Sequence, residues 1–340
     1  MRRLRRATAR AVPLLAALAL LAGCAPWGLG TARPPAAPSS GAVPSGGDYL
    51  PYDLEPLLRP GTDKYLGAAV DGVPASTVPL DAYARLTGKR PNLVEEYAAW
   101  GDGFDSSGVR TAWGRGALTL VSWEPRGTTM EEIAAGRSDA YVREFARAVR
   151  RLDLPVVLDF ADEMNGFWES WGPKHATAAQ YVAAYRHVHD VFTDLGVANV
   201  IWVWAPNIVN PAPDVALAPY YPGDGYVDWM GMIGYFTRDE DTFDAVFGRT
   251  LTELRALSDK PVLVVETAAE PTARRTADVR ELFAGVSGDD GIVGFVWFNH
   301  EKRADWRLEA GSAASRAEFR RLASGARYGF DVRERTGARP

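Results

Sequence analysis

The sequence VVLDFADEMNGFW occupies residues 156–168 and joins a strand pattern to an acid at its end. Its first half predicts a buried β-strand, and Glu163 then leads into an Asn-Gly turn and an aromatic pair. The sequence PVLVVE at residues 261–266 repeats this arrangement, because a second apolar run ends at Glu266. Carboxylates are rare in buried positions unless they are paired or functional. The two glutamates therefore indicate a carboxylate-pair site, provided that the fold brings them together.

Short apolar runs alternate with helical patterns along most of the chain. Helices are expected where apolar residues recur at helical spacing, as in residues 141–152 and 181–195. Eight strands alternating with helices indicate a parallel sheet of the α/β class, closed into a single (β/α)8 TIM barrel. We expect this domain to span residues 49–328 and a polar C-terminal tail to follow at 329–340. The expected strands are 65–70, 93–97, 117–122, 155–160, 200–204, 229–234, 261–265 and 292–298.

The first 24 residues have the pattern of an export signal. Five arginines precede an apolar run at residues 12–21, which is too short for a spanning helix of about 20 residues. The run ends in LAGC, which resembles the lipobox of bacterial lipoproteins and implies lipidation of Cys24. Residues 25–48, rich in Pro, Gly, Ala and Ser, are expected to be a flexible linker. We expect an exported protein, lipid-anchored to the outer face of the bacterial cell membrane, with a plain secretory signal as the alternative.

Composition and charge argue against several classes of function. The 340-residue chain has a formal net charge of −5, whereas nucleic-acid binding needs a basic surface against phosphates. Cys24 is the only cysteine, so the mature domain can form no internal disulfide. His187 and His189 lie two residues apart on an expected helix and do not share a face, which argues against a metal site there. We expect no metal, no cofactor and no nucleic-acid partner, and a monomer that touches the membrane through its lipid alone.

Glu163 and Glu266 would lie on the same rim of such a barrel. In (β/α)8 enzymes the active site is built at the C-terminal ends of the strands, and these residues end the fourth and seventh expected strands. Cleavage of a glycosidic bond needs one carboxylic acid to protonate the leaving oxygen and a second carboxylate as nucleophile or base. A single strand-end glutamate is more often part of a surface ion pair, but a pair in these positions favours catalysis.

Eight motifs follow one another along the chain: WEP (123–125), EMNGFW (163–168), IWVWAPN (201–207), YPGD (221–224), GY (234–235), PVLVVE (261–266), WFN (297–299) and DWR (305–307). This set resembles glycoside hydrolase family 26, a family of retaining endo-β-glycanases on (β/α)8 barrels. The resemblance implies hydrolysis of β-1,4-mannan, or of mixed-linkage β-glucan or β-1,3-xylan. It implies that Glu163 is the general acid/base and Glu266 the nucleophile, hydrogen-bonded by Tyr235. It also implies that Trp297 lies under the sugar being cleaved and that Trp168 stacks on a neighbouring sugar.

Other residues in these motifs are further candidates for substrate contact. Trp204 and Asn207 lie at and beyond the end of the fifth strand and are assigned to the site, as is Trp123, which directly follows the third. Trp202 is expected in the core instead.

Two residues beside the expected acid/base depart from the family pattern. The family usually has His directly before this glutamate and Arg three residues before that His, where this chain has Asp162 and Asp159. A neighbouring carboxylate disfavours ionisation of Glu163, which suits a general acid. We hypothesise that Asp162 receives a sugar hydroxyl. β-Mannan is the first polysaccharide substrate to expect, and a non-catalytic glycan-binding lipoprotein is the alternative from another class.

Overall fold

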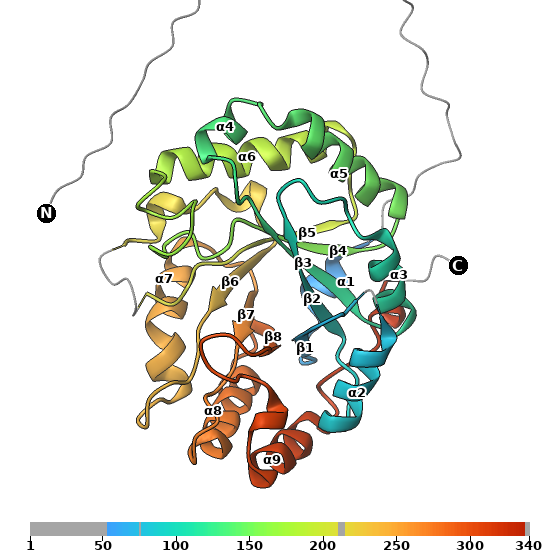
Figure 1. Ribbon diagram of the computed structural model, residues 1–340, viewed down its shortest axis with the longest axis vertical. Coiled ribbons are helices and arrows are strands. Elements are labelled where there is room, and N and C mark those ends of the chain that lie inside the picture. Colours follow the sequence, from blue (N-terminus) through green and yellow to red (C-terminus); the bar gives the residue numbers. More distant parts are fainter. Residues whose placement is uncertain (1–52, 75, 210–214, 337–340) are drawn as a thin grey trace, which may run out of the picture. The chain divides into compact units, whose positions relative to one another are not determined.

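The computed structural model describes residues 53–74, 76–209 and 215–336, and within them the chain forms a closed barrel of eight parallel strands. Helices surround the strands (Figure 1), which confirms the expected (β/α)8 TIM barrel. The strands are β1 Tyr65–Val70, β2 Leu93–Ala99, β3 Leu118–Glu124, β4 Val156–Phe160, β5 Val200–Trp204, β6 Trp229–Ile233, β7 Val262–Thr267 and β8 Ile292–Asn299. The α-helices are α1 Glu55–Leu58, α2 Thr77–Thr87, α3 Ser106–Gly114, α4 Met130–Ala134, α5 Asp139–Leu152, α6 Ala178–Asp194, α7 Arg249–Leu257, α8 Arg275–Gly288 and α9 Ala313–Ala323.

Cys24, together with the signal and linker expected for residues 1–48, lies outside the described residues. Within the three described ranges, no helix combines the length and the apolar character needed to cross a membrane.

Helix α6 illustrates how the sequence builds the outer layer. Thr177 accepts a hydrogen bond from the Gln180 backbone N–H at 3.2 Å, and the Gln180 side chain accepts one from the Thr177 N–H at 2.9 Å. This capping box satisfies amide groups that a helix start would otherwise leave without partners. Apolar side chains at helical spacing, including Tyr185 and Val188, are buried against the barrel. Gly196 then adopts φ 66°, and the helix has ended.

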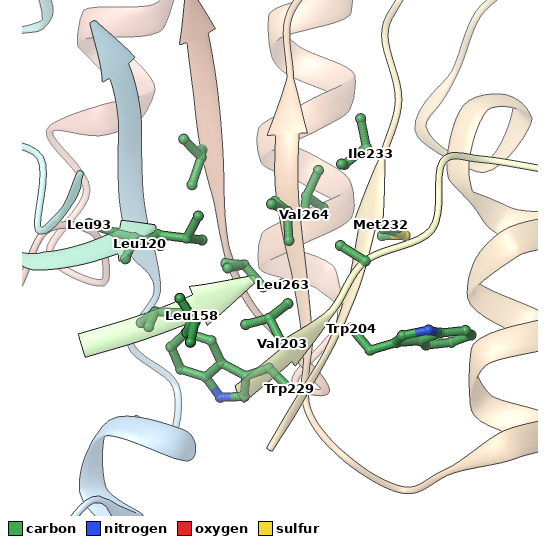
Figure 2. Packing of buried hydrophobic residues seen from close by; sticks show 14 of the residues in the cluster. Leu93, Leu120, Leu158, Val203, Trp204, Trp229, Met232, Ile233, Leu263 and Val264 are labelled. Carbon is green, nitrogen blue, oxygen red and sulfur yellow. The ribbon is translucent and has the colours of Figure 1, made fainter. Parts of the chain in front are cut away.

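The N-terminal end of the barrel is closed by α1. The Tyr65 hydroxyl donates to the Leu57 carbonyl at 2.9 Å, and Trp229 Nε1 donates to the Leu58 carbonyl at 3.0 Å. Beyond this end, apolar side chains such as Leu93, Leu120 and Leu263 fill the barrel interior (Figure 2). The C-terminal end of the barrel is thereby left as the end where a site can form.

The segment 329–336, which we expected to be a polar tail, is part of the barrel structure. Val332 is fully buried, the Phe330 ring packs on Tyr65 with 4.9 Å between centroids, and Asn92 Nδ2 donates to the Phe330 carbonyl at 3.0 Å. The expectation rested on the polarity of the segment and missed the two apolar residues that anchor it.

Candidate active site

The two strand-end glutamates meet at the C-terminal rim. Glu163 lies three residues beyond the end of β4, and Glu266 is the penultimate residue of β7. The negative charge of Glu163 contributes to a raised pKa of Glu266, so the two carboxyl groups interact electrostatically. The barrel therefore brings together the pair on which the sequence interpretation depends.

A strained turn directs Glu163 into the rim. Ala161 and Glu163 adopt φ values of 55° and 50°, in the left-handed region that costs residues with a Cβ about 1–2 kcal/mol each. The turn is held because the Glu163 N–H donates to the Ala205 carbonyl at 2.8 Å and the Gly166 N–H donates to the Glu163 carbonyl at 2.7 Å. Backbone strain of this kind is characteristic of functional sites.

A β-bulge in β7 directs Glu266. Val264 pairs with Met232 of β6, but Ile233 pairs with Glu266, so Val265 is an extra residue in the ladder. One extra residue reverses the alternation of side chains after it, which is how bulges re-aim residues next to active sites. Glu266 consequently takes the face of the strand that Val265 would have occupied in a regular ladder.

Each carboxylate receives two hydrogen bonds. The hydroxyls of Tyr97 and Tyr235 donate to Oε2 and Oε1 of Glu266. Asn207 Nδ2 donates to Oε1 of Glu163, and Trp168 Nε1 donates to its Oε2 at 2.9 Å. All four oxygens are thus oriented by donors from separate elements.

A further pair of hydrogen bonds fixes Asn207. The Asn165 side chain, fully buried in the turn after β4, donates to the Asn207 carbonyl at 2.8 Å and accepts from the Asn207 N–H at 2.9 Å. This double contact ties the end of β5 to the loop that carries Glu163. Tyr235 is held similarly by packing, since its ring lies 4.6 Å from that of Trp306.

Burial raises the pKa of both glutamates of the pair. Burial raises the pKa of Glu163, while the N–H groups of Trp168 and Asn207 lower it. Burial and then the charge of Glu163 raise the pKa of Glu266 to about 7, against the lowering effect of the Tyr97 hydroxyl. Because each negative charge opposes the other, ionisation of one carboxyl group makes ionisation of the second less favourable. One carboxylic acid and one carboxylate are what an acid and a nucleophile require.

Two aspartates add unpartnered carboxyl groups around the pair. Asp159 is fully buried, and of the described residues none hydrogen-bonds to either of its oxygens. Burial, followed by the charges of Glu163 and Glu266, raises the pKa of Asp159 well above its usual value. Asp162 accepts a 2.5 Å hydrogen bond from Trp171 Nε1 at its backbone carbonyl, while its side-chain Oδ1 has no described partner.

Four predicted substrate-binding residues lie at the rim beside the glutamate pair. Trp168 is 41% exposed beside Glu163, and Asp162 is partly exposed. Tyr235 and Asn207 contact the carboxyl groups directly. The structure therefore places these four residues in or on the rim.

Three predicted contacts, Trp123, Trp204 and Trp297, are corrected by the structure, because all three are fully buried. Trp123 stacks on Phe145 of α5 at 4.2 Å, and Trp297 meets Phe319 of α9 at 5.4 Å. Figure 2 shows Trp204 pointing away from the apolar residues that fill the barrel. All three occupy the helix-facing side of their strands, where no sugar can stack. Trp202 is buried against the same layer, as expected.

Residues that the sequence interpretation missed complete the rim. Tyr97 donates to Glu266. Phe298, the neighbour of Trp297, is itself buried but packs edge-on against Tyr97 and Tyr235, at centroid distances of 6.3 and 6.2 Å. Phe167 is 51% exposed next to Trp168. The sequence signal for Tyr97 was present, since two acids precede it at residues 95–96, inside an expected strand.

A parallel barrel with an acid pair on its C-terminal rim defines a class of protein, the two-carboxylate glycoside hydrolases. The model of glycosyl hydrolase family 26 matches residues 130–270, a range that contains both glutamates. Over this range the chain is similar to glycosyl hydrolase family 26.

Known proteins resemble the chain at modest identity. Endoglucanase H of Acetivibrio thermocellus is 27% identical over 277 residues, covering 76% of this chain and 30% of that protein. The β-1,3-xylanase TXYA of a Vibrio species is 24% identical over 206 residues, covering 53% of this chain and 43% of that protein. An endo-β-1,4-mannanase structure from Cellulomonas fimi matches with a TM-score of 0.64 at 18% identity, over 82% of this chain and 74% of that one, which supports the fold. The chain spans less than half of either curated relative.

Proposed function

We propose that the chain is a retaining endo-β-glycanase that works by double displacement. The observation that carries the proposal is the position of Glu163 and Glu266 at the C-terminal ends of β4 and β7, where hydrogen-bond donors hold both oxygens of each carboxylate. In the first step Glu266 attacks the anomeric carbon while Glu163 gives its proton to the leaving oxygen. In the second step Glu163 takes a proton from water, which attacks the same carbon and releases Glu266.

The surrounding residues have distinct parts in this reaction. Tyr97 and Tyr235 hold Glu266 in the orientation for attack, and their hydroxyls stabilise its charged form. The Trp168 N–H holds Glu163, and the exposed faces of Phe167 and Trp168 offer a surface for the apolar face of a pyranose. Together these residues would align a chain of sugars across the rim.

β-1,4-Mannan is the first candidate substrate, because the sequence motifs resemble those of mannan-degrading enzymes. Mixed-linkage β-glucan is the second candidate. Endoglucanase H, which aligns with 76% of this chain, supports a β-glucan as the second substrate. Asp162 and Asp159, in place of the family's usual His and Arg, also differ from the mannan pattern. β-1,3-Xylan is a third polymer, named by another relative.

Release of reducing sugar from purified polysaccharides tests the proposal. Mannan, glucomannan, lichenan, β-1,3-xylan and β-1,4-xylan are compared, with Glu266→Ala and Glu163→Ala as inactive controls. A retaining enzyme gives a product whose first-formed anomer matches the substrate linkage, which NMR detects directly. Binding without release on every polymer would instead favour a non-catalytic glycan-binding protein.

We also propose lipid anchoring through Cys24, on the basis of the LAGC sequence that ends the signal-like segment. In a bacterial host, Cys24→Ser should shift the protein from the detergent phase to the aqueous phase on phase separation. A wild-type protein found in the aqueous phase would contradict anchoring and leave a plain secretory signal.

A further inference from the structure

A cation lies beside the glutamate pair on the loop that follows β8. The ammonium of Lys302 is 5.5 Å from the ring centroid of Tyr97 and 4.9 Å from that of Phe298. The hydroxyl of the same Tyr97 donates to Glu266, so one side chain separates the ammonium from this carboxylate. The Lys302 side chain is exposed, and therefore it can be changed without opening the core.

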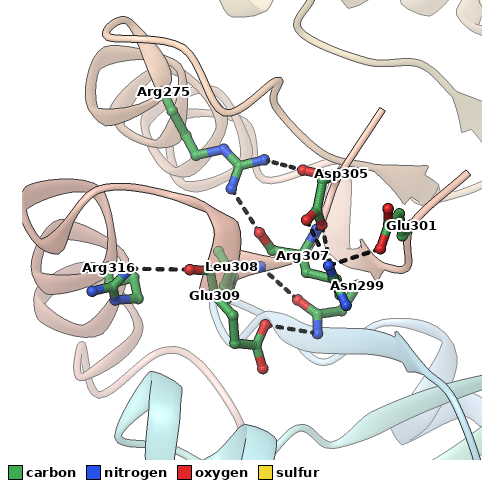
Figure 3. Close-up of polar contacts among 8 residues, drawn as sticks. All are labelled: Arg275, Asn299, Glu301, Asp305, Arg307, Leu308, Glu309 and Arg316. Carbon is green, nitrogen blue, oxygen red and sulfur yellow. Dashed lines mark hydrogen bonds and ion pairs between the residues drawn. The ribbon is translucent and has the colours of Figure 1, made fainter. Parts of the chain in front are cut away.

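The loop that carries Lys302 is firmly braced. Glu301 and Asp305 form an antiparallel bridge, and the Lys302 N–H donates to the Ala304 carbonyl at 3.1 Å. Arg307 bonds to both acids, at 2.9 Å to Glu301 and 2.6 Å to Asp305 (Figure 3). A flexible four-carbon side chain thus projects from a backbone whose position is well defined.

The same loop is tied to the helix layer through Arg275. This arginine is almost fully buried at the start of α8, and it donates to the carbonyls of Asp305 at 2.9 Å and Arg307 at 2.7 Å (Figure 3). Asn299, at the end of β8, accepts from the Leu308 N–H at 2.8 Å. These contacts fix the distance between the loop and the strand end, and hence where the ammonium can lie.

Negative charge dominates the surroundings of the pair. Arg126 is paired with Glu124 at 2.7 Å and with Glu169 at 3.0 Å, whereas the ammonium of Lys302 lies over two aromatic rings. The titratable groups around the pair are Glu95 and Tyr97 from β2, Glu124 and Arg126 from β3 and its loop, Asp159, Asp162 and Glu169 from β4 and its loop, Tyr235 after β6, and His300 and Lys302 after β8.

We propose that Lys302 is a positioning residue of the reaction, whose charge over Tyr97 keeps Glu266 available as a carboxylate and sets the pH range in which the pair works. This inference rests on the proposed function and extends it to a residue outside the family motifs quoted above. The charge acts through space on both carboxyl groups, since it lowers the pKa of Glu163 and of Glu266 against the effect of burial.

Removing this charge should move the pH profile in one direction. Lys302→Met makes the ionised form of each glutamate less favourable and so raises both pKa values. Both limbs of the bell-shaped pH profile of kcat/KM should therefore shift to higher pH. At this separation and partial exposure we expect a shift of about 0.5 pH unit. The shift should shrink in 1 M salt, where the screening length falls to about 3 Å.

Three variants separate charge from structure. Lys302→Arg keeps the charge and should retain the wild-type profile, whereas Lys302→Met should not. Arg303→Gln removes one positive charge from the adjacent exposed position and should leave both limbs in place. An unchanged profile in Lys302→Met, an equal shift in Arg303→Gln, or a failure of Lys302→Arg to retain the profile would each overturn the proposal.

A titration without substrate keeps this test independent of the proposed activity. The side-chain carboxyl carbons of Glu163 and Glu266, labelled with ¹³C and assigned with Glu163→Gln and Glu266→Gln, report protonation of the purified protein by NMR. Midpoints about 0.5 unit higher in Lys302→Met support the proposal, and identical midpoints refute it. If the wild type cleaves no polymer, the proposed function fails, while the titration still decides the role of Lys302.

Discussion

The hydroxyl of Tyr97 donates a hydrogen bond to Glu266 although their strands, β2 and β7, are not neighbours in the barrel. The contact crosses the mouth of the barrel and lowers the pKa of Glu266, which burial raises. Hydrogen bonds to charged groups contribute about 1.5–3 kcal/mol. Tyr97→Phe should therefore reduce kcat roughly 10- to 100-fold and move the acidic limb of the profile to higher pH. Steady-state kinetics between pH 4 and 9 measure both effects.

The matched control for Tyr97→Phe is Tyr226→Phe. Tyr226 packs against Arg186 at 5.1 Å and does not contact either glutamate, so loss of its hydroxyl should leave kcat unchanged. A wild-type kcat in Tyr97→Phe would show that Tyr235 alone suffices to hold Glu266.

Trp168 combines two roles that two substitutions can separate. Trp168→Phe keeps an aromatic face but removes the N–H that bonds to Glu163. Since that N–H lowers the pKa of Glu163, its loss should raise the pKa and move the alkaline limb upward. Trp168→Ala also removes the exposed ring and should raise KM about 10-fold or more beyond the effect of Trp168→Phe, if the ring stacks on a sugar as expected. Equal KM values for the two variants would exclude stacking.

The strands and both glutamates could be read from the sequence because parallel strands are long apolar runs with polar ends. The sequence does not show which side chains of a strand face the barrel interior and which face the helices. Strands of this kind are buried on both sides, so their sequences do not alternate between apolar and polar residues. Nothing in WFN distinguishes Trp297, which faces α9, from Phe298, which faces the rim.

Contacts between distant strands were equally beyond the sequence. The Tyr97–Glu266 bond joins residues 169 apart, and the bulge at Val265 that aims Glu266 has no proline or glycine to mark it. Both depend on how the closed barrel sets strand register. A resemblance can suggest which residues matter, but the geometry that unites them comes from the fold.

Asp159 should make the stability of the fold depend on pH. Burial raises its pKa in the folded state, so the folded chain binds more protons than the unfolded one above about pH 4. The free energy of unfolding must then fall as pH rises from there toward the folded-state pKa. Asp159→Asn removes this loss and should stabilise the protein by about 1–3 kcal/mol at pH 7.5, with little gain near pH 4.

Urea unfolding at pH 4 and pH 7.5 measures the gain from Asp159→Asn. Asp239→Asn removes the same charge from an exposed position and should change stability equally little at both pH values. A gain for Asp159→Asn that is the same at pH 4 as at pH 7.5 would mean that ionisation of Asp159 is not the cause.

Substitutions of Asp162 test whether this carboxylate, directly before the proposed acid/base Glu163, binds substrate. Asp162 is partly exposed at the rim, its buried Oδ1 has no described hydrogen-bond partner, and burial followed by the charge of Asp159 raises its pKa. Asp162→Ala should lower kcat on the preferred polymer at least 10-fold, while Asp162→Asn, which keeps an acceptor oxygen, should lose less. Asp194→Ala, on the last turn of α6, is the control for removing an acid elsewhere. If Asp162→Ala turned over every accepted polysaccharide at the wild-type rate, Asp162 would have no part in binding, and the choice of polymer would have to come from the aromatic rim.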